Sequence, residues 1–311
     1  MNFLVIGGTG FIGSYIVEAL LNNGHRVRVL DRTIKIKVSS QNKAVEYISG
    51  DYGNTSIIRD VLKDINYVVH LASSTVPSSS NKDPVFDIDT NLIKTIKLLQ
   101  EMENLKIKNI LYFSSGGTVY GEPEYLPIKE DHEKNPICSY GITKVAVENY
   151  LYLFQHLYGF KPIILRPSNP FGPRQGHFGS QGAIAIFTDR IINKKPITIW
   201  GDGQIKRDYV FISDLICAFA KAINLSRTGT YNIGSGEGIK LLDVIKSIEG
   251  YTGVDATINF EAPRDFDIQE IILDISKAET NLAWKPQVDF KSGIERHCNW
   301  YIENMRKDEK S

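Results

Sequence analysis

Tyr140 and Lys144 are the two residues of this sequence whose types and spacing most directly indicate chemistry. They stand four positions apart in a stretch, residues 140–158, whose apolar residues recur at helical spacing, so both side chains lie on one face of a predicted helix. A tyrosine hydroxyl titrates near about 10 and is a poor base at neutral pH unless nearby positive charge favours the phenolate. Lys144 can supply that charge, and the pair therefore predicts a tyrosine base.

The first half of the chain carries the pattern of a parallel sheet covered by helices, which would position this pair. Short apolar runs alternate with amphipathic stretches, as in βαβ units. We expect helices at residues 12–21, 56–62, 90–102 and 140–158, and strands at residues 3–6, 26–30, 45–48, 67–71, 110–114 and 163–166. The sequence therefore predicts an α/β fold with a doubly wound parallel sheet over residues 1–166.

The character of the chain changes at Pro167. Proline, glycine and asparagine cluster through Gln175, after which predicted helices at residues 184–192 and 241–248 alternate with short strands and loops. We expect residues 167–311 to form a smaller C-terminal α/β lobe that binds the substrate, with the chain crossing between the two lobes more than once.

Composition sets limits on the function. The 311 residues are 42% hydrophobic, which is enough for a sizeable core, and 36 basic residues balance 36 acidic ones, which argues against a nucleic-acid or membrane partner. The widely spaced Cys138, Cys217 and Cys298 suit neither a disulfide framework nor a zinc site, so no metal is expected. The first residues show neither a signal peptide nor a membrane span, and a cytoplasmic protein is expected.

A glycine-rich loop at residues 7–13 lies between the first predicted strand and the first predicted helix. Gly8, Gly10 and Gly13 fit the pattern G-x-G-x-x-G, while Gly7, Gly10 and Gly13 fit the variant G-x-x-G-x-x-G. In this context the glycines let the backbone approach a pyrophosphate at the N-terminus of the helix. The loop therefore predicts a dinucleotide site.

Asp31 indicates which dinucleotide is bound. It ends the second predicted strand, 18 residues after Gly13, where a carboxylate accepts hydrogen bonds from ribose hydroxyls and repels a 2′-phosphate. The neighbouring Arg32 could tolerate such a phosphate, so the preference is not absolute. The sequence favours NAD over NADP.

Further motifs recur along the chain, and their combination is more specific than any one of them. The sheet region contains Gly50-Asp51-Tyr52, His70-Leu71-Ala72, Asn91, Ser114-Ser115 and Val119-Tyr120-Gly121. With the glycine loop, Asp31 and the Tyr140 and Lys144 pair, they resemble the extended short-chain dehydrogenase/reductase family over nearly the whole chain. Residues 166–172, 200–203 and 207–210, and Arg264 with Asp267, look like the nucleotide-sugar-binding segments of UDP-sugar 4-epimerases.

This resemblance implies a set of binding residues. Guanidinium groups suit a diphosphate, a tryptophan can stack on uracil, and a carboxylate can bind a sugar or ribose hydroxyl. The implied substrate positions are Asn169, Gln181, Thr198, Trp200, Arg207, Arg264 and Asp267. The implied NAD positions are Gly7, Gly10, Phe11, Ile12, Gly13, Asp31, Arg32, Asp51, Tyr52, Leu71, Ala72, Ser73, Asn91, Ser114, Tyr140, Lys144 and Ser168.

The resemblance also implies a reaction. In such epimerases the tyrosine deprotonates the C4 hydroxyl of the sugar while hydride passes to NAD, whose positive charge helps the lysine to lower the tyrosine pKa. If the 4-keto intermediate rotates and takes the hydride back on its other face, the result is epimerisation at C4. We therefore expect an isomerase, a UDP-sugar 4-epimerase.

One position departs from the family pattern. The family places serine or threonine three residues before the Val-Tyr-Gly motif, where the hydroxyl relays the proton, and this chain has Gly116 there. We expect Thr118, or a water beside Gly116, to take over that role, with Ser115 as the other candidate. The loss of this hydroxyl is also the one feature that favours a non-enzyme, an NAD- and UDP-sugar-binding regulatory protein.

The same segment argues against the nearest alternative reactions. Sugar-nucleotide dehydratases and decarboxylases carry an acid immediately before Val-Tyr-Gly, and this chain has Thr118 there. The identity of the sugar stays open. Seven residues after Arg264, epimerases for plain hexoses tend to have a bulky tyrosine and those that accept N-acetyl sugars a smaller residue, and Ile271 of this chain is intermediate in size. UDP-glucose with UDP-galactose, UDP-GlcNAc with UDP-GalNAc, and UDP-glucuronate all remain candidates.

Two predicted helices carry more apolar surface than one core-facing stripe requires. A homodimer through a four-helix bundle, as in the family, would bury the excess. The residues concerned are Leu92, Ile93, Ile96, Leu98 and Leu99 on one helix, and Val145, Val147, Tyr150, Leu151, Leu153, Phe154 and Leu157 on the other.

Overall fold

The computed structural model describes residues 1–34, 44–176, 182–224, 228–264 and 267–308. These residues pack as two compact units. Unit 1 contains residues 1–120, 134–166 and 219–231, and unit 2 contains residues 121–133, 167–218 and 232–311. Residues 219–231 belong to unit 1 because the last strand of its sheet lies there, and residues 121–133 belong to unit 2, where Ile128 bridges Leu273. The chain therefore passes between the units at several points besides residue 166.

Unit 1 is built on a seven-stranded sheet in the order β10-β6-β5-β4-β1-β2-β3. Its strands are β1 (Asn2–Ile6), β2 (Arg26–Asp31), β3 (Val45–Ser49), β4 (Tyr67–His70), β5 (Asn109–Phe113), β6 (Lys161–Pro167) and β10 (Gly229–Ile233). The neighbours from β3 to β6 pair in parallel. This order contains the 3-2-1-4-5-6 arrangement of a Rossmann fold, and it confirms the predicted doubly wound sheet. Only β10 could not be expected from the local pattern.

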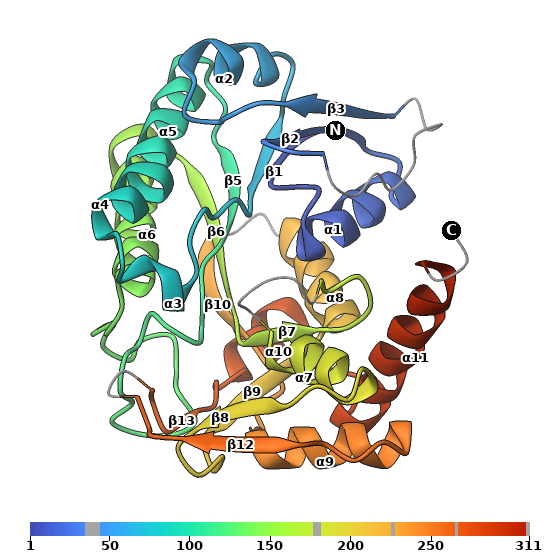
Figure 1. The fold of residues 1–311 in the computed structure, drawn as a ribbon. Coiled ribbons are helices and arrows are strands. Elements are labelled where there is room, and N and C mark those ends of the chain that lie inside the picture. Colours follow the sequence, from blue (N-terminus) through green and yellow to red (C-terminus); the bar gives the residue numbers. More distant parts are fainter. Residues whose placement is uncertain (35–43, 177–181, 225–227, 265–266, 309–311) are drawn as a thin grey trace. The chain divides into compact units, whose positions relative to one another are not determined.

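Helices cover both faces of this sheet (Figure 1). Helix α1 (Phe11–Asn22) lies on one face, and α5 (Lys94–Asn104) and α6 (Ser139–Tyr158) lie on the other. The apolar sides of α5 and α6 close a core with alternate residues of the strands, among them Leu4 and Ile6. The remaining helices of this unit are α2 (Thr55–Val61), α3 (Pro77–Ser80), α4 (Pro84–Asp87) and the π-helix η1 (Ile88–Ile93). The single helix predicted at residues 90–102 is thus a π-helical turn that continues into α5.

Unit 2 contains a four-stranded and a two-stranded sheet. Strand β9 (Lys206–Phe211) is central to the first, because β11 (Gly238–Lys240), β13 (Glu270–Ile271) and β7 (Asn169–Phe171) all pair with it. The second joins β8 (Ile197–Trp200) to β12 (Ile258–Glu261). Its helices are α7 (Ala183–Ile192), α9 (Leu241–Thr252), α10 (Ser276–Leu282) and α11 (Phe290–Asp308), and α8 (Ile212–Ile223) links the two units in sequence.

None of the helices in the described part of the chain combines the length and the apolar character that a membrane span requires.

Candidate active site

The glycine loop connects β1 to α1 and is shaped by close contacts. Gly7 has a φ of +86°, and a Cβ on it would lie 2.9 Å from the backbone nitrogen of Ala72. A Cβ on Gly13 would lie 2.2 Å from the carbonyl oxygen of Gly7, so a side chain would push α1 away from the loop. Packing thus requires both glycines, and the first contact brings the loop after β4 against the loop after β1.

Gly10 has a different role in this loop. A Cβ there would come no closer than 3.5 Å to any described atom outside its chain neighbours, so packing within the protein does not require glycine at this position. Gly10 is the N-cap of α1, and Phe11 and Ile12, both half-buried, begin the helix. A bare backbone at a helix N-terminus leaves room for a phosphate beside free N–H groups. These residues fit the pyrophosphate of a dinucleotide.

Asp31 ends β2 and is fixed to the glycine loop. Its Oδ2 accepts hydrogen bonds from the hydroxyl of Thr9 at 2.7 Å and from the backbone N–H of Thr9 at 3.2 Å, and its Oδ1 accepts from the N–H of Arg32 at 2.9 Å. A carboxylate retains further lone pairs for ribose hydroxyls. The Arg32 side chain is exposed beside it. The arrangement fits the expected recognition of a ribose.

Asp51 and Tyr52 follow β3, but only Asp51 keeps a partly exposed side chain. Partial burial opposes ionisation of Asp51, yet its hydrogen bonds with Lys94 Nζ and with the Gly53 N–H, both 2.7 Å, leave its pKa below the usual value. Tyr52 is buried in the core, and its hydroxyl donates to the Thr90 carbonyl at 2.6 Å. The Tyr52 side chain therefore packs in the core of unit 1, and its place among the implied NAD positions stays a prediction.

The loop after β4 is held by Asn91. Leu71 and Ala72 are half-buried and Ser73 is exposed. Asn91 lies in the π-helix and is 8% exposed, and its Oδ1 accepts from the N–H of Ser74 at 2.8 Å. Its Nδ2 donates to Thr75 and Asp87. The amide of Asn91 is thus bonded within the protein and shapes a loop implied to bind NAD.

Tyr140 is the second residue of α6, and the start of this helix is capped from elsewhere in unit 1. Among the described residues, the N-cap Cys138 finds no side-chain cap partner. Instead, the Ser139 N–H donates to Asn81 Oδ1 at 2.8 Å, and the Tyr140 N–H donates to Ser80 Oγ at 3.0 Å. The end of α3 therefore positions the tyrosine backbone.

Lys144 is buried on the same side of α6. Its Nζ donates to the Phe113 carbonyl at 2.8 Å and lies 4.7 Å from the Tyr112 ring centroid and 5.4 Å from that of Tyr140. Burial lowers the pKa of Lys144 to about 8, against the carboxylates of Glu148 and Asp87, which raise it. The ammonium is thus close to Tyr140 and easily deprotonated.

The pKa of Tyr140 is raised rather than lowered. Burial is the largest cause, the charges of Cys138 and Asp87 add to it, and a hydrogen bond with the Ser115 side chain acts in the opposite direction. A phenol that is partly withdrawn from water is more costly to ionise, and Lys144 is itself engaged with a carbonyl. The predicted base therefore keeps its proton at neutral pH in the protein alone, and Lys144 by itself does not convert it into a phenolate.

The segment around Gly116 distinguishes the two candidate hydroxyls. The Ser115 side chain hydrogen-bonds Tyr140. The Thr118 Oγ1 is buried and has no hydrogen-bond partner within the part of the chain that the structure describes. A Cβ on Gly141 would lie 2.6 Å from the Thr118 carbonyl oxygen, so this glycine lets α6 approach the segment closely. Ser115 is the hydroxyl in contact with the predicted base.

Glu148 of α6 forms a buried ion pair with Arg166. The sequence motifs did not indicate this pair. Arg166 donates from Nε and Nη2 to the two oxygens of Glu148 at 2.9 and 2.6 Å, and from Nη1 to the Tyr120 hydroxyl at 2.8 Å. Ser114 donates to the same carboxylate at 2.6 Å, so its hydroxyl serves this network. The one sequence signal was the position of Glu148, one helical turn after Lys144.

We expect Lys144 to titrate near its lowered pKa of about 8. Since the ordinary value is 10.5, the unfolded chain binds more protons than the folded one between these pH values, and the contribution of Lys144 to stability rises with pH across that window. Carbon-13 NMR of labelled lysine side chains measures the titration. The signal should disappear in Lys144→Met, and a Lys144 signal that titrates like a solvent-exposed lysine would contradict the burial argument.

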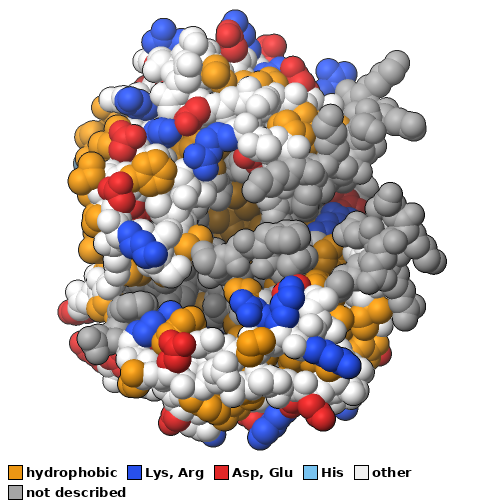
Figure 2. All heavy atoms as spheres, in the orientation of Figure 1, with side chains coloured by type: hydrophobic (Ala, Val, Ile, Leu, Met, Phe, Trp, Pro, Cys, Tyr) orange, Lys and Arg blue, Asp and Glu red, His pale blue; other side chains and the backbone are white. Residues whose placement is uncertain are grey.

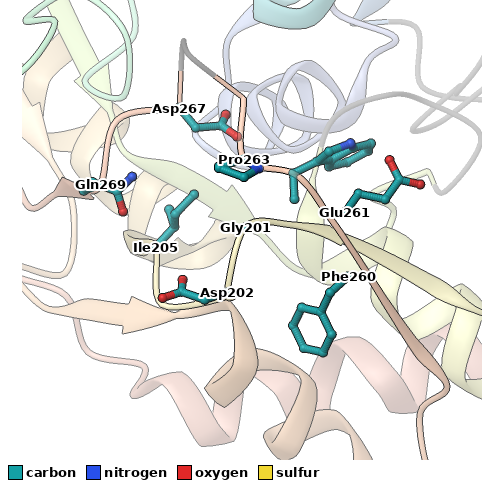
Figure 3. Close-up of a pocket in the computed structure, with 9 residues that line it drawn as sticks. Gly201, Asp202, Ile205, Phe260, Glu261, Pro263, Asp267 and Gln269 are labelled. Carbon is teal, nitrogen blue, oxygen red and sulfur yellow. The ribbon is translucent and has the colours of Figure 1, made fainter.

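Unit 2 presents a second cluster of predicted residues. The Arg264 guanidinium lies 4.4 Å from the Trp200 ring centroid and is paired bidentately with Asp267 at 2.8 and 2.7 Å. Trp200 and Asp267 line a pocket of about 700 Å³, into which the view of Figure 3 looks. Thr198 is half-buried in β8, two residues before Trp200. An exposed aromatic face beside a guanidinium can hold a planar base and an anion.

Arg207 lies in β9, where its register partner is Ile271 of β13. Burial lowers the pKa of Arg207, and the nearby charge of Arg264 contributes in the same direction. Asp267 already balances the charge of Arg264, and a diphosphate could bind beside the two guanidinium groups as a further anion. Gln181, the remaining predicted contact, lies outside the described residues.

Asp208 holds Asn169, another predicted substrate residue. This completely buried carboxylate accepts hydrogen bonds from the N–H groups of Ser235 and Leu273 at 2.7 and 3.2 Å. Its carbonyl accepts from Asn169 Nδ2 at 2.8 Å, while Ser168 is buried just before β7. Asp208 lies in the segment 207–210 that the resemblance singled out, but no role was predicted for it. It anchors the strand that carries Arg207.

Comparisons with known proteins agree with this geometry. The model of the NAD-dependent epimerase/dehydratase family matches residues 3–234. The UDP-glucose 4-epimerase of Mycolicibacterium smegmatis is 32% identical, over 97% of this chain and 98% of its own length. The structure of Thermotoga maritima UDP-glucose 4-epimerase with UDP-glucose is similar at a TM-score of 0.93 and 33% identity, covering 98% of this chain and 100% of that one.

A structure with a different sugar is about as similar. The UDP-N-acetylglucosamine 4-epimerase of Methanobrevibacter ruminantium, in complex with UDP-N-acetylmuramic acid, matches at a TM-score of 0.91 and 29% identity, over 98% of this chain and 99% of that one. The family match alone spans well over half of the sequence. The chain therefore belongs to the NAD-dependent epimerase/dehydratase family.

Proposed function

We propose that this chain is an NAD-dependent UDP-sugar 4-epimerase, in which unit 1 binds NAD and unit 2 binds the UDP-sugar. The observation that carries the proposal is the half-buried Tyr140, which is hydrogen-bonded to Ser115 and whose ring centroid lies 5.4 Å from the Lys144 ammonium. The similarity to 4-epimerases along nearly the whole chain supports it. We also keep the expectation of a cytoplasmic enzyme.

The proposed mechanism assigns one task to each group. NAD held by the glycine loop and Asp31 would supply the acceptor, and then the donor, of a hydride for C4 of the sugar. Tyr140 removes the proton from the C4 hydroxyl, Ser115 relays it, and Lys144 stabilises the phenolate that Tyr140 passes through. The raised pKa of Tyr140 in the protein alone means that this phenolate forms readily only beside an additional positive charge, which limits deprotonation to the cofactor-bound enzyme.

The arginines complete the cycle. Arg207 and Arg264 hold the diphosphate, while the 4-keto sugar turns and presents its other face. Protonation of the C4 oxygen by Tyr140, together with return of the hydride to that other face of C4, would then give the epimer and restore the enzyme. Because Thr118 replaces the acid that an elimination requires, a reversible oxidation and reduction is the complete reaction.

The sugar is the open part of the proposal. Ile271, the residue whose size bears on the choice of sugar, is 1% exposed and lies beside Arg207 in the sheet register. It is therefore next to one of the two arginines that we propose to hold the diphosphate. Its intermediate size keeps both the plain hexoses and the N-acetylhexosamines as candidates. UDP-glucuronate is the alternative substrate, which the two arginines could accommodate through its carboxylate.

The test is an assay of the purified protein with each UDP-sugar. We expect interconversion of at least one pair of C4 epimers, with no net consumption of NAD. Tight binding of UDP-sugars with no epimer formed would instead support the regulatory protein that Gly116 suggested. Formation of a stable dehydrated or decarboxylated product would replace the epimerase by one of the alternative reactions.

Removal of the Ser115 hydroxyl should slow the reaction. We expect Ser115→Ala to lower kcat by about 100-fold, the lower range for loss of a proton-transfer group, because this hydroxyl contacts Tyr140. Thr118→Val is the matched comparison at the other candidate. A large loss in Thr118→Val with none in Ser115→Ala would return the relay to Thr118, and small losses in both would leave it to water.

We further propose a homodimer through the helices of unit 1. Leu98, Leu99, Val147, Leu151 and Phe154 of the predicted surface are buried within the monomer. Ile93, Leu153 and Leu157 of that surface are exposed, and four further exposed apolar residues lie on α4, η1 and α6: Val85, Phe86, Ile88 and Ile142. Figure 2 shows apolar side chains along the left edge, where Figure 1 has α4 and α6.

We expect charged residues on this face to prevent association. Leu153 and Leu157 are 43% and 55% exposed, so Leu153→Lys with Leu157→Lys should leave the monomer folded and give half the native mass by light scattering. Leu105→Lys, at an equally exposed residue after α5, is the control. A native protein that is already monomeric would contradict the proposal.

A further inference from the structure

Asp87 is a completely buried carboxylate that the proposed mechanism does not use. It is the last residue of α4 and precedes the π-helix η1. Burial raises its pKa, but hydrogen bonds from surrounding side chains outweigh this and leave the pKa below the usual value. The donors are Thr75, Asn91, Ser139 and Thr143. Asp87 is therefore a fixed negative charge inside unit 1.

One oxygen of Asp87 holds the first turn of α6. Its Oδ2 accepts from the Ser139 hydroxyl at 2.7 Å and from the Thr143 hydroxyl at 2.8 Å. These two residues immediately precede Tyr140 and Lys144 in the sequence. Negative charge is also favourable at the N-terminus of a helix. Asp87 thus stabilises, from a different element, the turn that carries the predicted base.

The other oxygen holds the loop after β4. Its Oδ1 accepts from Asn91 Nδ2 at 2.8 Å and from the Thr75 hydroxyl. Asn91 in turn accepts from the N–H of Ser74. The π-helical turn places Asp87 and Asn91 together on the inner side, and such turns are frequent at functional sites. One carboxylate therefore joins the loop at residues 73–75, next to the glycine loop, to the catalytic turn.

We propose that Asp87 is a positioning residue, which fixes Tyr140 and Lys144 relative to the loop at residues 73–75 by hydrogen-bonding both segments at once. It acts through Ser139 and Thr143 and does not touch the reacting atoms. The inference rests on the proposed function for the role of Tyr140. A displacement of about 1 Å at a catalytic group lowers the rate by about 100-fold, so a support of this kind has a measurable effect.

The variant Asp87→Asn keeps the size of the side chain and removes its charge. The amide oxygen can still accept hydrogen bonds from hydroxyl groups, and the amide N–H groups can donate to hydroxyl oxygens. We therefore expect a folded protein. We expect kcat to fall by about 10–100-fold, with the KM for the UDP-sugar changed by no more than about twofold, because the proposed substrate contacts lie in unit 2. The acidic limb of the kcat profile should move to lower pH, since the charge of Asp87 raises the pKa of Tyr140.

Two controls separate positioning from general damage. Asp89→Asn makes the same change two residues later, at an exposed side chain in the π-helix η1, and should behave like the native protein. In a double-mutant cycle, Asp87→Asn should add little to Ser139→Ala with Thr143→Val, because all three changes break the same hydrogen bonds.

Hydrogen–deuterium exchange of the NAD-bound protein gives a readout that does not depend on activity. We expect faster exchange at residues 139–144 in Asp87→Asn than in Asp89→Asn, and equal exchange at residues 197–211 of unit 2. If the native protein epimerises no UDP-sugar, the proposed function fails while this measurement still tests Asp87. Native kcat, pH profile and exchange in Asp87→Asn would overturn the inference, as would uniformly faster exchange with a raised KM.

Discussion

Replacement of Tyr140 by Phe is expected to lower turnover by at least about 1000-fold while NAD stays bound. The change removes one hydroxyl oxygen and nothing else from a half-buried side chain at the start of α6. No other group in the proposed mechanism can take the proton from the C4 hydroxyl, because Lys144 donates to the Phe113 carbonyl and lies against the face of the tyrosine ring. Steady-state epimerisation and the NAD content of the purified protein measure the two parts of the prediction.

Tyr158→Phe is the matched control for this experiment. It makes the same chemical change at the other end of α6, where the side chain is 44% exposed, and it should leave both activity and NAD content unchanged. Appreciable turnover in Tyr140→Phe would remove the base assignment. Loss of NAD from the variant would instead show that the hydroxyl serves cofactor binding.

Replacement of Glu148 by Gln is expected to cost about 3–5 kcal/mol of folding free energy, the range for breaking one side of a buried ion pair. The side chains of Glu148 and Arg166 are 0% and 2% exposed, so the guanidinium would be left in the interior without its counter-charge. Gln keeps the shape of the site but cannot neutralise that charge. Chemical denaturation, followed by circular dichroism, measures the loss.

Two comparisons make this prediction specific to burial. Asp60→Asn breaks an ion pair on the surface, in which the side chains of Asp60 and Lys63 are 70% and 67% exposed. This change should have no measurable effect on the free energy of unfolding. Joint replacement of Glu148 and Arg166 by leucines should recover part of the loss, because it removes both charges, although Ser114 and Tyr120 lose their partners. A Glu148→Gln protein as stable as the native one would show that solvent reaches this site.

The local pattern of the sequence predicted most of the architecture. The strands and helices around the glycine loop, Asp31 and α6 follow from apolar periodicity and from glycine at defined positions, both of which act over a few neighbouring residues. For the same reason β10 was not foreseen, since its place in the sheet depends on pairing with β6, far earlier in the chain. The π-helical turn before α5 was likewise hidden, because its apolar spacing is close to that of an ordinary helix.

The sequence by itself determined the Rossmann fold, the family and the pair Tyr140 and Lys144, because each depends on residue types at short, fixed spacings. Only the tertiary structure decided the state of that pair. Burial raises the pKa of Tyr140, Ser115 rather than Thr118 contacts it, and Asp87 and Glu148 surround Lys144 with negative charge. Desolvation and contacts between distant segments produce these effects, and neither can be predicted from the spacing of residues along the chain.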